Sequence, residues 1–232
     1  MIRDQIKDEQ YFGEYIEQQK QRINKFQNKL DENEVSPDRV FAVQKKIDSL
    51  IFQVFIAKYS MGKQVENLVG NYKKLVADLP KFWDPTSGYV DMLWMTSVGI
   101  MLEVDDEILD VLAKLTNEAG WNDYLFSYLL QSRNSSIGLS EKYFMFETPY
   151  KHLFDVINGG REQATNNLKK YLENEWYREH NDTGWFDNHK NQQKLYYGYW
   201  SFESGAIAKI LQLDDSSLKD TPYYPYDMVH YQ

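Results

Sequence analysis

Apolar residues recur every three to four positions along most of the chain, which is the spacing of amphipathic helices. In the first such segment Ile16, Ile23, Phe26 and Leu30 lie three, four or seven positions apart, and they predict a helix over 3–32. The regular alternation of apolar and polar residues that is typical of strands does not occur. The hydrophobic pattern therefore predicts an all-α fold.

The second helix is expected to be among the most buried. Ser36 is a good N-cap and Pro37 fits the first helical turn, so this helix should cover 37–59. It carries two apolar stripes, which are Val40, Val43, Ile47, Leu50 and Val54 on one side and Phe41, Phe52, Phe55 and Tyr59 on the other. A helix that is apolar on two sides has neighbours on both, so we expect it to be central.

Similar patterns predict the remaining helices, at 62–79, 89–102, 105–118, 121–130, 149–157, 161–179 and 195–212. We expect a compact bundle of about 8–10 helices, arranged as antiparallel helical hairpins. It divides into an N-terminal region, 1–103, and a C-terminal region, 104–232. No spacer rich in glycine, serine or proline separates the two regions, so they are expected to pack together as one globular unit.

Negative charge is concentrated in one part of the chain. Residues 84–125 contain nine acidic residues and a single lysine, a net charge of −8 out of −9 for the whole chain. Such a local field repels nucleic acid and attracts a basic protein surface. Its centre is a run of five acids, Glu103, Asp105, Asp106, Glu107 and Asp110.

The spacing of these acids leaves two interpretations open. Asp106 and Asp110, like Glu103 and Glu107, are like-charged pairs at i,i+4, and each pair costs a few tenths of a kcal/mol, about 0.2–0.5. Acids also suit a helix start, where they interact favourably with the helix dipole. The run is therefore either a solvated helix face or an interface for a basic partner. Ile108, Val111, Leu112 and Leu115 are expected to face the core.

Glu203 stands among apolar residues on the predicted helix 195–212. Tyr196, Trp200, Ile207 and Leu211 fall near one face, and Glu203 lies between them. A carboxylate that faces a core must find hydrogen-bond donors or raise its pKa. We predict a structural acid bonded to tyrosine hydroxyls, an indole N–H or backbone amides. The alternative is a general acid or base, which requires a second polar group.

Other signals exclude several functions. The chain has no apolar run long enough to span a membrane, no secretory signal and no cysteine, so a cytoplasmic protein that does not bind membranes is predicted. Its four histidines form no zinc motif, and no phosphate-binding loop, nucleophile elbow or dinucleotide fingerprint occurs. We therefore predict no metal, no cofactor and no enzymatic activity.

The C-terminal third contains three distinctive sequence motifs. They are Gly-Tyr-Trp-Ser-Phe-Glu at 198–203, Asp-Asp-Ser-Ser-Leu at 214–218 and Tyr-Tyr-Pro-Tyr-Asp at 223–227. The second segment predicts a short capped helical turn. In the third, Pro225 together with Pro222 predicts an extended aromatic tail.

As a set, these segments resemble the PoNi family, immunity proteins of polymorphic-toxin DNases. The resemblance implies a helical, non-catalytic protein that binds a cognate nuclease toxin domain of the PD-(D/E)xK type and blocks it. It also implies that six matching residues form a structural motif, namely Trp200, Glu203, Asp214, Asp215, Tyr224 and Pro225. The five acids of 103–110 are then the hypothetical toxin-binding surface. The alternatives are a helical enzyme that uses Glu203 in an inter-helix pocket, and a general helical adaptor.

Overall fold

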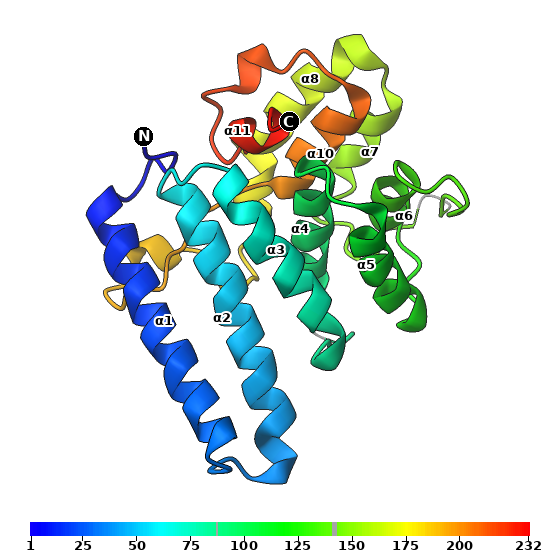
Figure 1. Cartoon of the computed structure of the whole chain (residues 1–232). Helices are drawn as coiled ribbons and strands as arrows, with labels where there is room; N and C mark the ends of the chain where they lie inside the picture. The colour runs from blue at the N-terminus through cyan, green and yellow to red at the C-terminus, as the bar shows by residue number, and fades with distance from the viewer. Residues whose placement is uncertain (87, 141–142) are drawn as a thin grey trace. The chain divides into compact units, whose positions relative to one another are not determined.

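A computed structural model describes residues 1–86, 88–140 and 143–232 (Figure 1). The regular elements of these residues are all helical, which confirms the predicted all-α fold class. The chain forms two compact units, one of Met1–Asp84 with Asp187–Gly198, and the other of Pro85–Phe186 with Tyr199–Gln232. This division differs from the predicted regions 1–103 and 104–232, which stay a prediction.

The first unit contains α1 (Glu9–Asp31), α2 (Val40–Ser60) and α3 (Glu66–Asp78), with 3-10 turns at Pro37–Arg39 and Leu79–Lys81. The predicted start of the first helix, at residue 3, is wrong. The carboxylate of Asp4 accepts the amides of Ile6 and Lys7 at 2.8 and 2.6 Å, and forms a separate turn. Asp8 then caps α1 by accepting the amide of Tyr11 at 2.8 Å.

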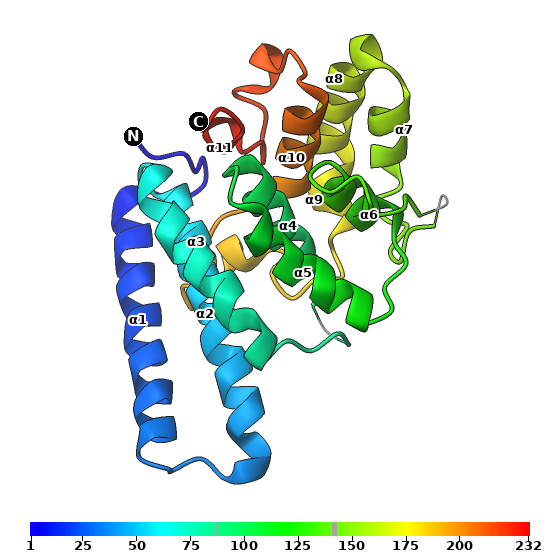
Figure 2. The same ribbon diagram turned by 45° about the vertical axis from the view of Figure 1, so that its right-hand side comes forward.

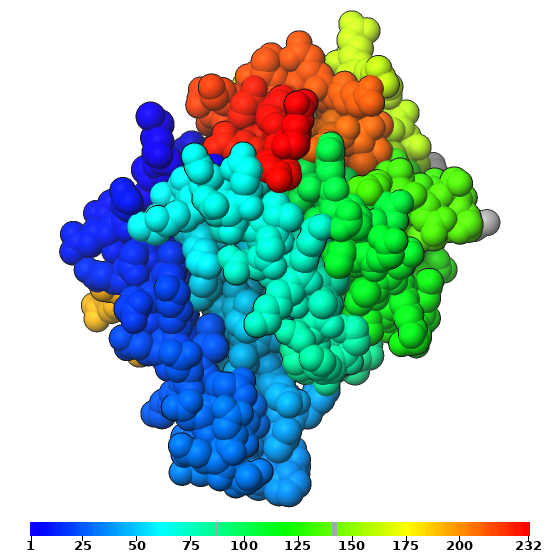
Figure 3. All heavy atoms as spheres, in the orientation of Figure 1, coloured from blue at the N-terminus to red at the C-terminus, as the bar shows by residue number. Residues whose placement is uncertain are grey.

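The expectation that both apolar stripes of α2 are buried holds from Phe52 onwards, where Phe55 and Tyr59 are at most 2% exposed. It is wrong before this residue, where Phe41 is 46% and Ile51 37% exposed. The start of α2 is exposed because α3, which packs beside it, is shorter than α2. Within this unit α2 lies between α1 and α3, and the end of the α1–α2 hairpin extends past the end of α3 (Figures 1 and 3). Pro37 does begin a helical turn, whereas Ser36 makes no side-chain cap.

The segment 187–198 belongs to the first unit and corrects the prediction of a helix over 195–212. Tyr196 exchanges two hydrogen bonds with the Tyr11 hydroxyl, from its amide and to its carbonyl oxygen, each at 3.1 Å. The Ser60 hydroxyl donates to the carbonyl of Tyr197 at 3.0 Å. Gly198 then takes a φ of +114°, which a glycine adopts easily. The last long helix therefore begins only at Phe202.

The second unit contains α4 (Tyr89–Met101), α5 (Asp106–Glu118), α6 (Tyr124–Gln131), α7 (His152–Asn158) and α8 (Arg161–Lys170). A π-helix, Tyr171–Trp176, joins α8 to α9 (Tyr177–Glu179), and α10 (Phe202–Leu211) and α11 (Tyr226–Val229) complete it. The buried helix α10 packs against α4, α7, α8 and α11 (Figure 2). Because α11 is helical, the expectation of a fully extended aromatic tail is wrong.

Gly205 allows α10 to approach its neighbours closely. A Cβ atom at this position would lie 2.5 Å from the Met101 sulfur and 2.6 Å from Cγ of Pro225. We expect Gly205→Ala to lower the free energy of unfolding by about 1–3 kcal/mol, the usual cost of overpacking. Gly70→Ala is the matched control, because Gly70 is an exposed α3 residue with nothing within 4 Å.

The control should raise the free energy of unfolding by up to about 1 kcal/mol through helix propensity alone. Urea denaturation of both variants measures the two changes. Equal effects at the two positions would show that close packing at Gly205 does not limit stability.

Candidate functional site

The predicted acidic run forms an exposed surface at the start of α5. Asp105 is the N-cap residue, and Asp106 and Glu107 occupy the first helical turn, where the helix dipole favours acids. Asp110 follows one turn later, and all five predicted acids are exposed. Glu103 precedes the helix at a φ of +50°. We call these five exposed acids together the α5 acidic face.

The buried side of α5 differs slightly from the predicted one. Leu109, Leu112 and Leu115 are buried, whereas Ile108 and Val111 are only half-buried. The helix is therefore rotated by a fraction of a turn from the predicted orientation. Asp106 and Asp110 still point away from the core, as the pattern of Leu112 and its neighbours predicted.

Two acids of this face have basic neighbours that the sequence pattern did not indicate. Arg133 donates to Oδ1 of Asp106 at 2.7 Å and to the Val104 carbonyl at 2.9 Å. Lys209 pairs with Glu103 at 3.0 Å. The Asp106 side chain is 65% exposed, and ion pairs so open to water contribute little to stability. These pairs partly offset the local repulsion and leave the acidic face accessible.

A groove of about 240 Å³ lies beside the acidic face. Asp106, Asp110, Arg133 and Asn134 supply its polar groups. Its apolar lining consists of Leu109, Ala113, Leu130 and Ile137. The surface therefore combines acidic and apolar side chains in one groove.

Glu203 lies in the first turn of α10 and is fully buried, so the predicted burial is confirmed. Its Oε1 accepts the Trp176 indole N–H at 2.6 Å, the Ser201 hydroxyl at 2.7 Å and the Tyr171 hydroxyl at 3.5 Å. Burial raises the pKa of Glu203 to about 7, and these hydrogen bonds oppose the rise only in part. Its Oε2 is buried without a hydrogen bond from the described residues.

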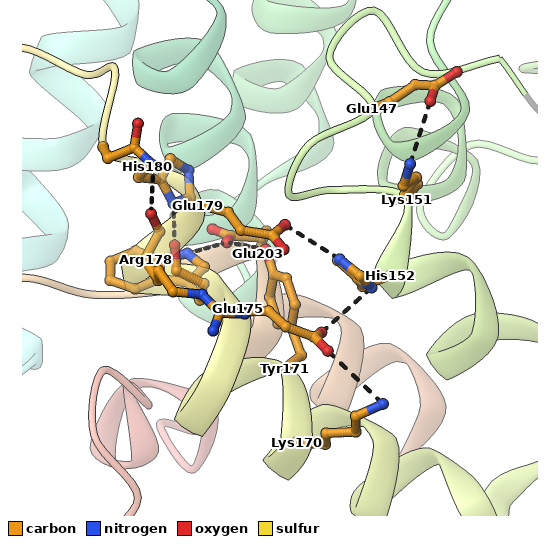
Figure 4. A network of polar contacts seen from close by, with 12 residues as sticks. Glu147, Lys151, His152, Lys170, Tyr171, Glu175, Arg178, Glu179, His180 and Glu203 are labelled. Atoms are coloured by element: carbon orange, nitrogen blue, oxygen red, sulfur yellow. Dashed lines mark hydrogen bonds and ion pairs between the residues drawn. The ribbon is translucent and has the colours of Figure 1, made fainter.

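Histidines lie on either side of this carboxyl group (Figure 4). His180 donates from Nδ1 to the Trp176 carbonyl at 2.6 Å, so its Nε2 accepts the Tyr150 hydroxyl at 2.9 Å. Burial lowers the pKa of His180 to about 4. His152 contacts Glu175 and Glu179 at 3.3 and 3.2 Å. Trp176 thus joins Glu203 to His180 and ties α10 to the π-helix.

The other residues of the predicted motif are mostly buried. Trp200, Tyr224 and Pro225 are in the core of the second unit. Asp215 is 3% exposed and accepts the Tyr224 hydroxyl at 2.6 Å and His230 Nε2 at 2.9 Å. Asp214 is exposed. It accepts the Ser216 hydroxyl and amide, which lower its pKa and hold the predicted helical turn at Ser216–Leu218.

The contrast between these two adjacent acids is testable. Asp215→Ala should lower the free energy of unfolding by about 1–3 kcal/mol, because it leaves the buried Tyr224 hydroxyl unsatisfied and releases His230. Asp214→Ala removes only exposed bonds and should change it by less than about 1 kcal/mol. Thermal denaturation of both variants checks this order, and a larger loss for Asp214→Ala would contradict it.

The fold and the site define an all-α protein whose exposed chemistry is an acidic surface. Within the described residues no group of three metal-ligating side chains occurs, and no helix has the length and apolar character to cross a membrane. Two family models match the chain, "PoNe immunity protein (PoNi), N-terminal" over 3–114 and "PoNe immunity proteins (PoNi), C-terminal" over 121–228.

The chain belongs to the PoNi family, and is thus an immunity protein of a polymorphic nuclease toxin. A crystal structure of the protein PA2201 from Pseudomonas aeruginosa is similar, with a TM-score of 0.63 and 19% identity, over 82% of this chain and 74% of that one. This likeness concerns the fold alone. Comparison with the curated proteins gives no match.

Proposed function

We propose that the protein binds the DNase domain of its cognate toxin directly, through the α5 acidic face, and neutralises it without catalysis. The observation that carries the proposal is the placement of Asp106, Glu107 and Asp110 on an exposed helix surface, with Asp106 and Asp110 lining a partly apolar groove. Family membership supports the partner class, a nuclease toxin.

Electrostatics make this pairing favourable. A DNase holds the phosphates of DNA in a basic groove, so an acidic helix face is complementary to it and competes with DNA. Complementary charge mainly accelerates association and sets specificity. The groove lined by Leu109 and Leu130 would then hold apolar or long basic side chains, which slow dissociation.

The surroundings of Glu203 support a non-catalytic role. Its carboxyl group is fully buried, and its Oε1 is occupied by Trp176 and Ser201. A general acid or base has to reach the proton that it transfers, directly or through one water. We therefore assign Glu203 to the stability of the second unit, and assign the protein's action to binding in the cytoplasm.

Co-expression with the cognate nuclease domain tests the proposal. Cells that carry the wild-type chain should survive, and the two proteins should purify together. Survival without any complex would show that protection works by another route than binding. Death of cells that contain folded wild-type protein would refute the proposed partner.

A further inference from the structure

The first unit contains a large open groove, and the function proposed for α5 makes no use of it. The groove has a volume of about 700 Å³ and runs along α2, with the end of α1 on one side and α3 on the other. Its apolar lining includes Leu30, Val35, Val40, Ile47, Ile51 and Phe82. A volume of this size accommodates several side chains.

The groove includes the part of α2 that is more exposed than the sequence predicted. The apolar stripe of α2 continues to the hairpin end, although α3 does not cover it there (Figures 1 and 3). Ile51 lines the groove and is 37% exposed, and Leu30, Val35 and Val40, which also line it, are half-buried. Contiguous apolar surface of this kind on a soluble protein marks an interaction site. Three helices with an apolar groove along the central one form a surface on which a fourth helix can pack.

The two ends of the groove carry opposite charges. Asp31 lines the hairpin end, and in the adjoining connection the exposed acids Glu32, Glu34 and Asp38 outnumber the exposed Arg39. Asp48 and Asp78 line the groove between its two ends. Lys58 and Lys74 line the opposite end. Burial and the nearby Lys20 and Lys63 lower the pKa of Lys58. An acidic side chain of a bound segment would therefore interact favourably with this end of the groove. A bound segment is therefore favoured when it is basic at the hairpin end and acidic at the other.

We infer that the groove along α2 is a second contact surface for the toxin and takes an amphipathic helix of that protein. Val40 and Lys58 are about 27 Å apart along α2 at 1.5 Å per residue, so the occupant has about five turns. Its apolar side chains at i, i+4 and i+7 would face Ile47, Ile51 and Phe82. This inference rests on the proposed function, because it requires that the chain binds the toxin.

Ile51→Asp tests the groove, because it places a charge on the groove wall at a residue that is already partly exposed. We expect the dissociation constant of the purified complex with the nuclease domain to rise about 30-fold, the effect of losing an anchor residue. Ile6→Asp is the matched control, since Ile6 is 43% exposed and does not line the groove. It should bind like the wild type, and circular dichroism should show both variants folded.

The outcomes separate the two proposals. If the wild type does not bind the nuclease domain, the proposed function itself fails. If the wild type and Ile51→Asp bind equally well, the groove inference alone is overturned. A wild-type dimer in light scattering that Ile51→Asp dissociates would make a second copy the occupant, and would also overturn it.

The absence of cysteine from the chain permits a direct map of the occupant. Gln44→Cys places one thiol in the groove, and Gln21→Cys places one on exposed α1 away from it. With a benzophenone maleimide on this thiol, the Gln44→Cys protein in complex should crosslink to an amphipathic segment of the nuclease domain. Equal labelling from both positions, or none from Gln44→Cys in a formed complex, would contradict the inference.

Discussion

Exchanging both Asp106 and Asp110 for lysine is expected to slow association with the toxin's DNase domain by about one to two orders of magnitude at low salt. The two acids are exposed on one face of α5 and border the same groove. Their reversal turns attraction to a basic DNA-binding surface into repulsion. The salt dependence of the association rate should weaken accordingly, because fewer screened charges steer the encounter. Stopped-flow association at several ionic strengths measures both effects.

A matched double variant controls for net charge. Glu162 and Asp220 are exposed acids of the second unit outside α5, and their exchange for lysine changes the net charge by the same amount. This control should associate almost like the wild type. Since the Asp106–Arg133 pair is exposed, the α5 variant should also keep its thermal stability within about 1 kcal/mol. Equal slowing by both double variants would locate the steering charge elsewhere.

Glu203→Leu is expected to lower the free energy of unfolding by about 3 kcal/mol. The substitution leaves the Trp176 indole N–H without its acceptor and removes the acceptor of the Ser201 and Tyr171 hydroxyls, all inside the core. Glu203→Gln retains an acceptor oxygen and should lose less. If the Gln variant folds but no longer protects cells, the carboxyl group has a role beyond stability. This result would favour the alternative of a helical enzyme that uses Glu203.

The same residue has a characteristic pH signature. The pKa of Glu203 is about 7 when folded, against 4.5 as its ordinary value. Between these pH values the folded state holds a proton that the unfolded state has lost, so the free energy of unfolding falls as pH rises. His180 has the opposite effect, because its pKa is lowered to about 4 in the folded state. Between about pH 4 and 6.5 the unfolded state holds the extra proton, so the free energy of unfolding rises with pH.

The difference between the wild type and Glu203→Gln therefore isolates the Glu203 contribution. Relative to this variant, the wild type should lose about 3 kcal/mol of stability from pH 4.5 to 7.5. Urea denaturation at a series of pH values measures this difference. A flat difference would show that Glu203 does not hold a proton in the folded protein.

The sequence predicted helices well where local signals define both ends. Asp105 and Gly120 bracket α5, and the mainly apolar segment 89–102 forms the buried α4. The predictions were wrong where contacts between residues far apart in the sequence determine the structure. Tyr196 and Trp200 fit a helical pattern, yet Tyr196 pairs with Tyr11, 185 residues away, and the helix starts only at Phe202. Glu203 was correctly predicted to be buried, although part of the helical face used in that argument does not exist.

The candidate site was predictable in its charge but not in its shape. The run from Glu103 to Asp110 is visible in the sequence, because charge patterning is local. The neighbouring groove depends on Leu130 and Ile137, and the partner of Asp106 is Arg133, 27 residues later. The uncovered half of α2 was missed for a similar reason, since the apolar stripe does not reveal where α3 ends.

Direct neutralisation without catalysis is tested most directly by titrating this protein into a DNA-cleavage assay of the purified cognate nuclease domain. We expect cleavage to fall linearly and to stop at a fixed stoichiometric ratio of the two proteins. The α5 double lysine variant should need more protein or more time to reach the same end point. Complete inactivation by a small fraction of an equivalent would indicate an enzyme, and undiminished cleavage at excess protein would contradict direct neutralisation.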